Sequence, residues 1–338
     1  MLNLIVLLVF LESVLCLIDP LSIGIAAGIG TWLYNYDAVK EHTYCRFVEC
    51  CTPKHIPVDI NSLRRALERD LYGQHIVINQ VIPALRSHFA NGDKSKKPLV
   101  ISFHGTPGTG KNYVSDFIAK YIYKEGLNSK FVHKFLGRSD FPVESENHWY
   151  KVIKSAVSGC PWSLFIFDEV DKLPPGVFES ISSFLDHHSH IHGVNYRKAI
   201  FLFLSNTAGI EIAQHLGNLM EKGVRREETT IQDFEKILEV GAYNLQGGLQ
   251  KASIIESHLI DHYIPFLPLE RRHVEECVKA EYSILIYCQT CCYFFICRSM
   301  VEDFVTYDKN TGLFATTGCK RLSKKIEVDV SDLTLSEK

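Results

Sequence analysis

The chain lacks several features that would assign it to a common class of protein. Its 36 basic and 39 acidic residues give a formal net charge of −3, and it has no basic stripe or tail. That balance gives no support for nucleic-acid binding. Its 338 residues contain no N-x-[ST] glycosylation acceptor, no internal repeat and no low-complexity tract. With 46% hydrophobic and 22% charged residues, the composition is that of an ordinary globular protein with an ample core.

Two apolar runs lie near the N-terminus, and the second, residues 21–33, is too short to span a bilayer comfortably. Residues 1–17 carry a single charge and predict a secretory signal peptide, although the usual basic n-region is missing. The second run, within residues 18–36, predicts a helix that lies at the lipid interface, because aromatic residues gather at its end: Trp32, Tyr34 and Tyr36. The alternative is one uncleaved membrane helix built from both runs. Either interpretation predicts the secretory route and contact with a membrane surface.

Eleven cysteines fit an oxidising compartment, in which disulfides form and persist. Residues 37–60 form a connector that contains the adjacent pair Cys50 and Cys51. Cys288 and Cys291 have C-x-x-C spacing, but no second such pair and no histidine pair lies at zinc spacing. A metal site is therefore the less favoured interpretation of that pair.

Four short apolar runs predict the strands of an α/β domain. Helical patterns separate them, as expected for a mainly parallel sheet. Two further helical patterns, residues 63–71 and 76–89, precede the first run. We expect a large domain over 61–267, a smaller unit over 268–325 and a tail over 326–338. The four predicted strands cover residues 98–104, 130–136, 163–168 and 199–205.

A glycine-rich loop after the first predicted strand indicates a phosphate-binding site. Residues 105–112 match G-x-x-x-x-G-K-[ST] at every defined position except the last, where Asn112 replaces Ser or Thr. The glycines of such a loop let backbone N–H groups turn toward the phosphates, and the lysine reaches the β- and γ-phosphates. We therefore predict that a nucleoside triphosphate binds to Gly105, Thr106, Pro107, Gly108, Thr109, Gly110, Lys111 and Asn112.

Polar residues end two later strands and supply candidate catalytic groups. Asp168 and Glu169 follow an apolar run, where a phosphate-loop enzyme places the Mg²⁺-organising aspartate and the residue that activates water. Asn206 ends another apolar run. Because ligands bind outside the carboxyl ends of such strands, Asn206 is positioned to reach the γ-phosphate or the attacking water.

Together these motifs resemble the torsins, a family of Clp-like AAA+ ATPases. The marks are the G-T-G-K-N loop, F-I-F-D-E-V-D-K, F-L-S-N, P-F-L-P-L-E at residues 265–270 and G-C-K at 318–320, with the double cysteine after an apolar N-terminus. The resemblance covers about residues 20–325. It implies an AAA+ phosphate-loop domain with a central, mainly parallel sheet, followed by a small α-helical lid domain.

The resemblance also implies a role for each matching residue. Lys111 and Asn112 are expected to contact nucleotide, Asn112 and Asp168 to hold Mg²⁺, and Glu169 to act as the catalytic base. Asn206 is expected to sense the γ-phosphate, and Lys320 to report nucleotide from the lid. Cys277 and Cys319 match a pair that can form a disulfide in torsins; the alternative for Cys277 is an inert buried thiol.

A further implication is that the chain is incomplete as an enzyme. Torsins lack an arginine finger of their own and take one from a membrane-anchored lumenal partner. His273 occupies the finger position here, and Arg271 and Arg272 before it remain candidate substitutes. Between residues 135 and 150 there is no aromatic-apolar-glycine pore loop, so we do not expect peptide threading.

One stretch departs from the family pattern. Residues 282–297 contain no charge, whereas torsins have an amphipathic, charge-bearing helix there. The stretch is interpreted as a buried insertion, a membrane-touching patch or a misplaced exon boundary.

The predicted function is that of a torsin-like ATPase with weak intrinsic activity, which uses ATP and Mg²⁺ to remodel protein assemblies. The predicted location is the endoplasmic reticulum lumen and nuclear envelope, at the membrane. We expect a homo-oligomer or mixed ring, activated by a membrane-anchored partner. The alternative is a nucleotide-gated membrane scaffold that hardly hydrolyses ATP.

Overall fold

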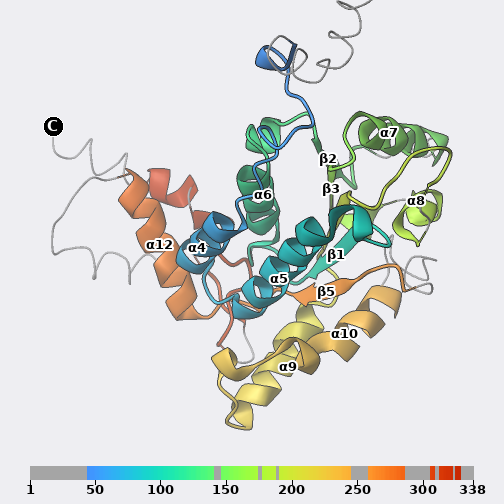
Figure 1. Cartoon of the computed structure of the whole chain (residues 1–338). Coiled ribbons are helices and arrows are strands. Elements are labelled where there is room, and N and C mark those ends of the chain that lie inside the picture. Colours follow the sequence, from blue (N-terminus) through green and yellow to red (C-terminus); the bar gives the residue numbers. More distant parts are fainter. Residues whose placement is uncertain are drawn as a thin grey trace, which may run out of the picture. The chain divides into compact units, whose positions relative to one another are not determined.

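The computed structural model describes residues 44–140, 146–173, 177–187, 190–244, 258–285, 305–308, 312–322 and 324–328 (Figure 1). The predicted signal peptide and apolar segment, residues 1–17 and 18–36, lie outside these ranges. Within them, no helix combines the length and apolar character needed to cross a membrane. The chain divides into two compact units, residues 1–52 and 53–338.

The described part of the first unit is short and cross-linked. A 3₁₀ turn, η1 (Tyr44–Arg46), carries Cys45, which forms a disulfide with Cys50. Their Cα atoms lie 5.4 Å apart, and both side chains are buried. The structure thus gives Cys50, in the predicted connector, a disulfide partner.

The second unit alternates strands and helices along the chain. Its helices are α4 (Ile60–Asp70), α5 (His75–Asn91), α6 (Lys111–Ile122), α7 (Glu146–Gly159), α8 (Val177–Leu185), α9 (Gly209–Glu221), α10 (Ile231–Asn244) and α12 (Arg271–Leu285). Its strands are β1 (Leu99–His104), β2 (Val132–Leu136), β3 (Leu164–Asp168), β4 (Ile200–Ser205) and β5 (His262–Pro265). Short 3₁₀ turns are η2 (Gly92–Lys94), η3 (Gly126–Asn128), η4 (Val170–Lys172) and η5 (Arg226–Glu228).

The strands form one sheet in the order β2-β3-β4-β1-β5, and every neighbouring pair is parallel. The sheet confirms the four predicted strands and the mainly parallel α/β fold. The sequence reasoning missed β5, a four-residue strand that pairs with β1 from Ile101 to His104. Because all strands run the same way, their carboxyl ends meet at one edge.

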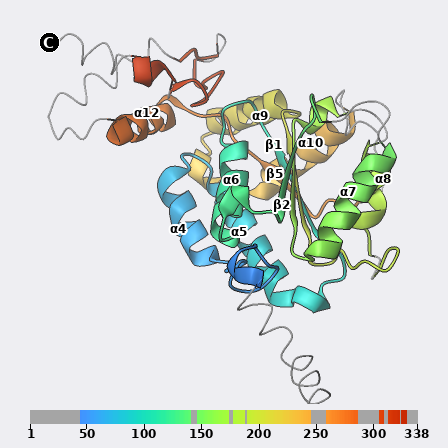
Figure 2. The same cartoon turned by 90° about the horizontal axis from the view of Figure 1, so that it is seen from above.

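Helices cover both faces of the sheet, which explains why its central strands are apolar throughout. Figure 2 shows α5 and α6 on one side of the sheet and α7 and α8 on the other. The α7/α8 side packs on alternate aromatic residues of β3 and β4: Phe165, Phe167, Phe201 and Phe203. On α6, Val114 and Ile118 are fully buried.

The segment after residue 268 has a small apolar core of its own. It joins Leu269, Val274 and Val278, around the start of α12, to Leu322 and Ile326 near the C-terminal end of the described chain. The predicted domain boundary at 267/268 stays a prediction, because residues 53–338 form one compact unit.

Candidate functional site

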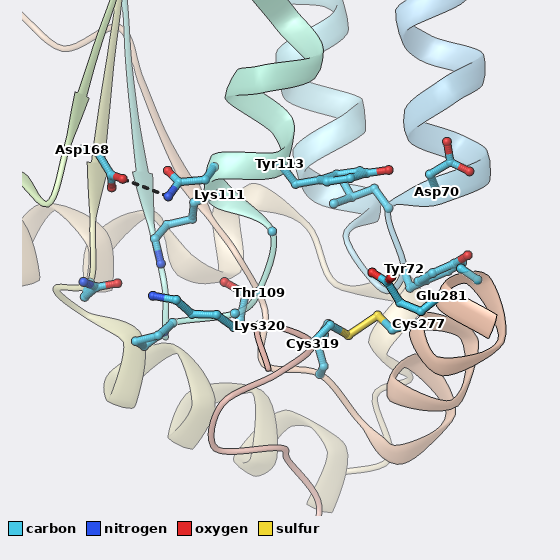
Figure 3. Close-up of a pocket in the computed structure, with 18 of the residues that line it drawn as sticks. Asp70, Tyr72, Thr109, Lys111, Tyr113, Asp168, Cys277, Glu281, Cys319 and Lys320 are labelled. Atoms are coloured by element: carbon cyan, nitrogen blue, oxygen red, sulfur yellow. Dashed lines mark hydrogen bonds between the residues drawn. A yellow bond between two sulfur atoms is a disulfide. The ribbon is translucent and has the colours of Figure 1, made fainter. Parts of the chain in front are cut away.

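A cavity of about 830 Å³ opens where β1, β3 and β4 end (Figure 3). It is lined by the phosphate loop, by Asp168, Glu169 and Asn206, and by Lys320. Its other end is lined by aromatic and apolar side chains, including Tyr72, Tyr113 and Leu269. The structure therefore brings together, around one cavity, residues that the sequence reasoning took from four separate segments.

The phosphate loop has the backbone shape that its glycines predict. Gly108 has φ +82°, in the left-handed region, and the carbonyl oxygen of Thr317 occupies the place where a Cβ at Gly108 would stand. Gly110, with φ +107°, directly precedes α6 and has no side chain that could cap it. The N-terminal N–H groups of α6 are thus left for a ligand, and the helix dipole favours an anion there.

Lys111, the first residue of α6, is folded back onto the loop. Its Nζ donates to the carbonyl oxygens of Gly105 at 2.7 Å and Thr106 at 3.0 Å. Burial lowers the pKa of its ammonium to about 8, although the nearby carboxylates of Asp168 and Asp171 partly oppose this shift. A bound phosphate would supply the negative charge that this buried cation lacks.

Asn112 shows how an amide can replace the usual hydroxyl. Its Nδ2 donates to Asp168 Oδ2 at 2.8 Å, which leaves its Oδ1 as the atom able to face a cation. Carboxylate and amide oxygens are ligands that Mg²⁺ accepts, usually with several waters and substrate phosphates completing the shell. The donor set therefore fits Mg²⁺. The described residues hold no cluster of three metal-binding side chains.

Glu169 follows β3 in a strained backbone conformation, and its carboxylate pairs with an arginine. Its φ is +53°, in the left-handed region that non-glycine residues rarely adopt, and its N–H donates to Asp168 Oδ1 at 2.8 Å. Its Oε2 lies 2.8 Å from Nε of Arg138. The sequence reasoning missed Arg138, which follows β2 and lines the same cavity.

Asn206 also lines the cavity, and its turn is anchored by buried polar groups. Its N–H donates to Asp171 Oδ1 at 3.3 Å. The next residue, Thr207, has its Oγ1 3.0 Å from Nδ1 of His104 and 2.8 Å from Oγ of Ser205. Burial, and then the charge of Lys111, lower the pKa of His104 to about 3, so the ring is neutral. The sequence reasoning missed this network.

The end of the chain reaches the phosphate loop through its backbone. The N–H of Cys319 donates to the carbonyl oxygen of Gly108 at 3.2 Å, which places Lys320 at the cavity. Cys319 forms a disulfide with Cys277 of α12, and the two Cα atoms are 6.2 Å apart. The structure thus contains the cross-link that the resemblance implied, and Cys277 is not a free thiol.

His273, at the predicted finger position, and the two arginines before it are engaged within this chain. His273 is buried, and its Nδ1 accepts from the N–H of Glu270 at 3.2 Å. Arg272 pairs with Glu227 at 2.6 Å and with Glu270 at 3.0 Å. The guanidinium of Arg271 lies over the ring of Tyr307.

Two sequence predictions fall partly outside the described residues. Residues 282–285 form the last turn of α12, but 286–297, the rest of the uncharged stretch, are not described. Residues 135–150, which contain no pore-loop motif, are described by the structure except for 141–145.

Fold comparison places the chain among AAA+ proteins. It matches solved structures entitled "S. cerevisiae Hsp104-ADP complex", with a TM-score of 0.56 and 14% identity, and "Closed State CryoEM Reconstruction of Hsp104:ATPyS and FITC casein", with a TM-score of 0.57 and 16% identity. Each match covers 82% of this chain, which spans about half the length of those chains (48% and 47%). The fold and the site define an AAA+ phosphate-loop protein, a class whose fold implies nucleotide binding.

Sequence comparison defines the family. The torsin family model matches residues 45–167. A torsin-like protein of Drosophila melanogaster is 48% identical over 332 residues, covering 96% of each chain. One of Caenorhabditis elegans is 36% identical over 317 residues, covering 92% of this chain and 87% of its own. The chain belongs to the torsin family.

Proposed function

We propose that this torsin family member binds ATP with Mg²⁺ in the cavity and hydrolyses it slowly by itself. The observation that carries the proposal is the convergence of Lys111, Asp168, Glu169 and Asn206 on one cavity at the carboxyl edge of the sheet. Phosphoryl transfer needs positioning and charge stabilisation rather than covalent chemistry by the protein. These side chains offer a cation, a metal ligand, a base and an amide.

Each group has a defined task. Lys111 and the N-terminus of α6 hold the phosphates, and Asp168 with Asn112 holds Mg²⁺, which neutralises charge on the phosphate oxygens. Glu169 takes the proton of the attacking water, and Asn206 orients that water or the γ-phosphate. The aromatic and apolar end of the cavity, near Tyr72 and Tyr113, suits a planar base.

Full activity requires a partner in this proposal. An arginine supplied to the γ-phosphate accelerates such reactions by about 10³–10⁵. The engagement of Arg271 and Arg272 within the chain, and the burial of His273, support a finger supplied in trans. We propose a membrane-anchored lumenal partner as its source, and a homo-oligomer or mixed ring that remodels protein assemblies at the endoplasmic reticulum and nuclear envelope membrane.

The domain plan is part of the same proposal. The signal peptide (1–17) directs the chain to the lumen, and the apolar segment (18–36) associates with the membrane. The small helical lid (268–325) closes over the nucleotide. The disulfide between Cys277 and Cys319 lies within that lid and joins α12 to the turn beside Lys320.

ATP turnover of the purified lumenal protein, with and without a lumenal partner domain, tests the proposal. We expect slow turnover alone, stimulation by the partner, and loss of both in Glu169→Gln with ATP still bound. Lys111→Ala is expected to lose binding. Fast turnover without a partner that is indifferent to Glu169→Gln would overturn the mechanism.

A second candidate function is a nucleotide-gated membrane scaffold. The amide of Asn112, bonded to Asp168 where an AAA+ enzyme normally has a hydroxyl, favours it. Under this alternative, ATP alone drives assembly into rings or filaments, and the assemblies persist when partner is added. Disassembly that requires an intact Glu169 would decide for the ATPase.

A further inference from the structure

Arg138 is the unexpected charged residue of the cavity. It follows β2 by two positions, and its guanidinium Nε lies 2.8 Å from Oε2 of Glu169, the proposed catalytic base. The side chain of Arg138 is 66% exposed and that of Glu169 27% exposed. Oε2 of Glu169 is itself buried and accepts no hydrogen bond from the described residues, so its contact with Arg138 is an ion pair without hydrogen-bond geometry. An ion pair with one partner this exposed is weak and readily exchanged.

The backbone brings these two residues together and keeps them close. In the parallel register, Leu136 of β2 lies opposite Asp168 of β3, so the residues that follow the two strands leave the sheet side by side. Gly137 N–H donates to the carbonyl oxygen of Asp168 at 2.9 Å. A Cβ at Gly137 would collide with the carbonyl oxygen of Glu169, which explains the glycine before Arg138.

Two other cations that line the cavity, Lys111 and Arg69, are held differently. Lys111 is buried and bonded to loop carbonyls. Arg69 forms two bonds with its neighbour Asp70, at 2.7 and 2.6 Å. Arg138 is the cation that shares an ion pair with the catalytic carboxylate, so movement of Arg138 changes the charge environment of the base directly.

We propose that Arg138 is a cation shared between Glu169 and the γ-phosphate. In the nucleotide-free site it pairs with the Glu169 carboxylate. When ATP binds, the guanidinium moves to the γ-phosphate, a better bidentate partner, and leaves Glu169 free to accept a proton from water. ADP lacks the γ-phosphate and leaves the pair intact. Arg138 is thus a positioning residue for the base and a reader of ATP against ADP. The inference rests on the proposed nucleotide site.

A double-mutant cycle tests this exchange with a non-hydrolysable ATP analogue, so that turnover does not enter the measurement. Affinity for the analogue and for ADP is measured in the wild type, Glu169→Gln, Arg138→Gln and the double variant. If Arg138 moves, Glu169→Gln should raise the affinity for the analogue for two reasons. It removes the repulsion between the Glu169 carboxylate and the γ-phosphate, and it removes the Arg138–Glu169 ion pair that must break when the analogue binds. In the Arg138→Gln background there is no ion pair to break, and Glu169→Gln relieves only the repulsion. The increase in analogue affinity caused by Glu169→Gln should therefore be several-fold smaller in that background than in the wild type.

The opposite sign identifies the competing arrangement. If Arg138 stays on Glu169 and merely neutralises it, removing Arg138 exposes the carboxylate to the γ-phosphate. Glu169→Gln then raises the affinity for the analogue more in the Arg138→Gln background than in the wild type, and this result would overturn the proposal. Equal gains in both backgrounds overturn it as well. We also expect Arg138→Gln to weaken binding of the analogue about tenfold and to leave ADP affinity unchanged. The variant loses a charge-assisted hydrogen bond to the γ-phosphate, and this loss is partly offset because no ion pair with Glu169 has to break.

Two controls separate this result from bulk charge and from folding. Arg69→Gln removes a positive charge from the same cavity, and the gain from Glu169→Gln should be unchanged in that background. Arg138→Lys keeps the charge without the planar fork and should restore part of the preference for the analogue. Thermal unfolding checks that each variant is folded. If the wild type binds neither nucleotide, the proposed function itself fails; if it binds both and the cycle gives the other sign, only the role of Arg138 fails.

Discussion

Lys111 is a buried cation whose charge should respond to a bound phosphate. Burial lowers its pKa from 10.5 to about 8 in the empty site, and approaching phosphates reverse that shift. Above pH 8 the empty site therefore loses a proton that the bound site retains. ATP affinity should be flat below about pH 8 and fall by up to about tenfold between pH 8 and 9.

Calorimetry in two buffers of different ionisation enthalpy measures the proton uptake. We expect uptake to approach one proton per ATP near pH 9, and Lys111→Met to abolish it along with most of the affinity. Affinity that stays constant to pH 9.5, without proton uptake, would show that Lys111 does not titrate in this range.

Thr207 follows Asn206 directly and connects it to the buried hydrogen-bond network of His104 and Ser205. Its hydroxyl contacts Nδ1 of the neutral His104 and Oγ of Ser205, so both strand ends beneath the site are tied together. Thr207→Val removes the hydroxyl at nearly constant volume and leaves buried polar atoms unpaired, at a cost of about 1–3 kcal/mol. We expect a lower unfolding temperature and a several-fold loss of preference for ATP over ADP.

The conservative variant separates positioning from general stability. Thr207→Ser keeps the hydroxyl, and it should restore the preference for ATP even if the lost methyl group still lowers the unfolding temperature. Equal losses of nucleotide preference in both variants would contradict the role assigned to the hydroxyl.

At the scale of elements, the backbone of the phosphate loop lies directly against the turn at Gly318. Gly318 has φ +51°, and the carbonyl oxygen of Gly108 occupies the place of its Cβ. Gly318→Ala must therefore push the turn, with Lys320, away from the loop. We expect at least tenfold weaker ATP binding in a protein that remains folded, measured by equilibrium titration.

Gly312 supplies a matched control for this substitution. It also has positive φ, +66°, but nothing lies within 4 Å of the position of its Cβ. Gly312→Ala therefore bears the same kind of backbone strain, about 1 kcal/mol, without the collision. If both variants lose nucleotide binding equally, backbone strain rather than the contact with Gly108 is responsible.

The same elements show what the sequence could and could not predict. The apolar runs of β1, β3 and β4 identify buried strands because helices cover both faces of the sheet. β5 was missed because four residues, among them His262 and Pro265, give no apolar run. Arg138 was missed because its place beside Glu169 depends on the register of the edge strand β2 against β3. β3 is apolar up to Asp168, so it has no alternation of apolar and polar side chains that would fix this register.

At the scale of the whole chain, single side chains join segments far apart in the sequence. Arg226 is the clearest case, because its side chain is 1% exposed and donates to the carbonyl oxygens of Gly73 and Pro268. It also pairs with Glu270 at 3.2 Å. The residues before α5 and before α12 are thus held to η5, which fixes both segments beside the cavity.

The disulfide between Cys277 and Cys319 also joins distant segments, because it links α12 covalently to the turn before Lys320. It closes a loop of 42 residues, for which chain entropy predicts a stabilisation of about 4 kcal/mol. It also holds the N–H that Cys319 donates to Gly108. Replacing both cysteines by serine should lower the free energy of unfolding by about 2–4 kcal/mol and weaken ATP binding, and reduction of the wild type should do the same.

The disulfide between Cys45 and Cys50 serves as the control for this prediction. Cys45 and Cys50 are five residues apart, so their cross-link restrains a much shorter loop, and neither lines the cavity. Replacing both by serine should cost less stability and leave ATP affinity unchanged. Titration of both double variants with ATP, before and after reduction, distinguishes the effect of the Cys277–Cys319 disulfide from that of the Cys45–Cys50 disulfide. If reduction weakens ATP binding even when Cys277 and Cys319 are already serine, the redox response arises elsewhere in the chain.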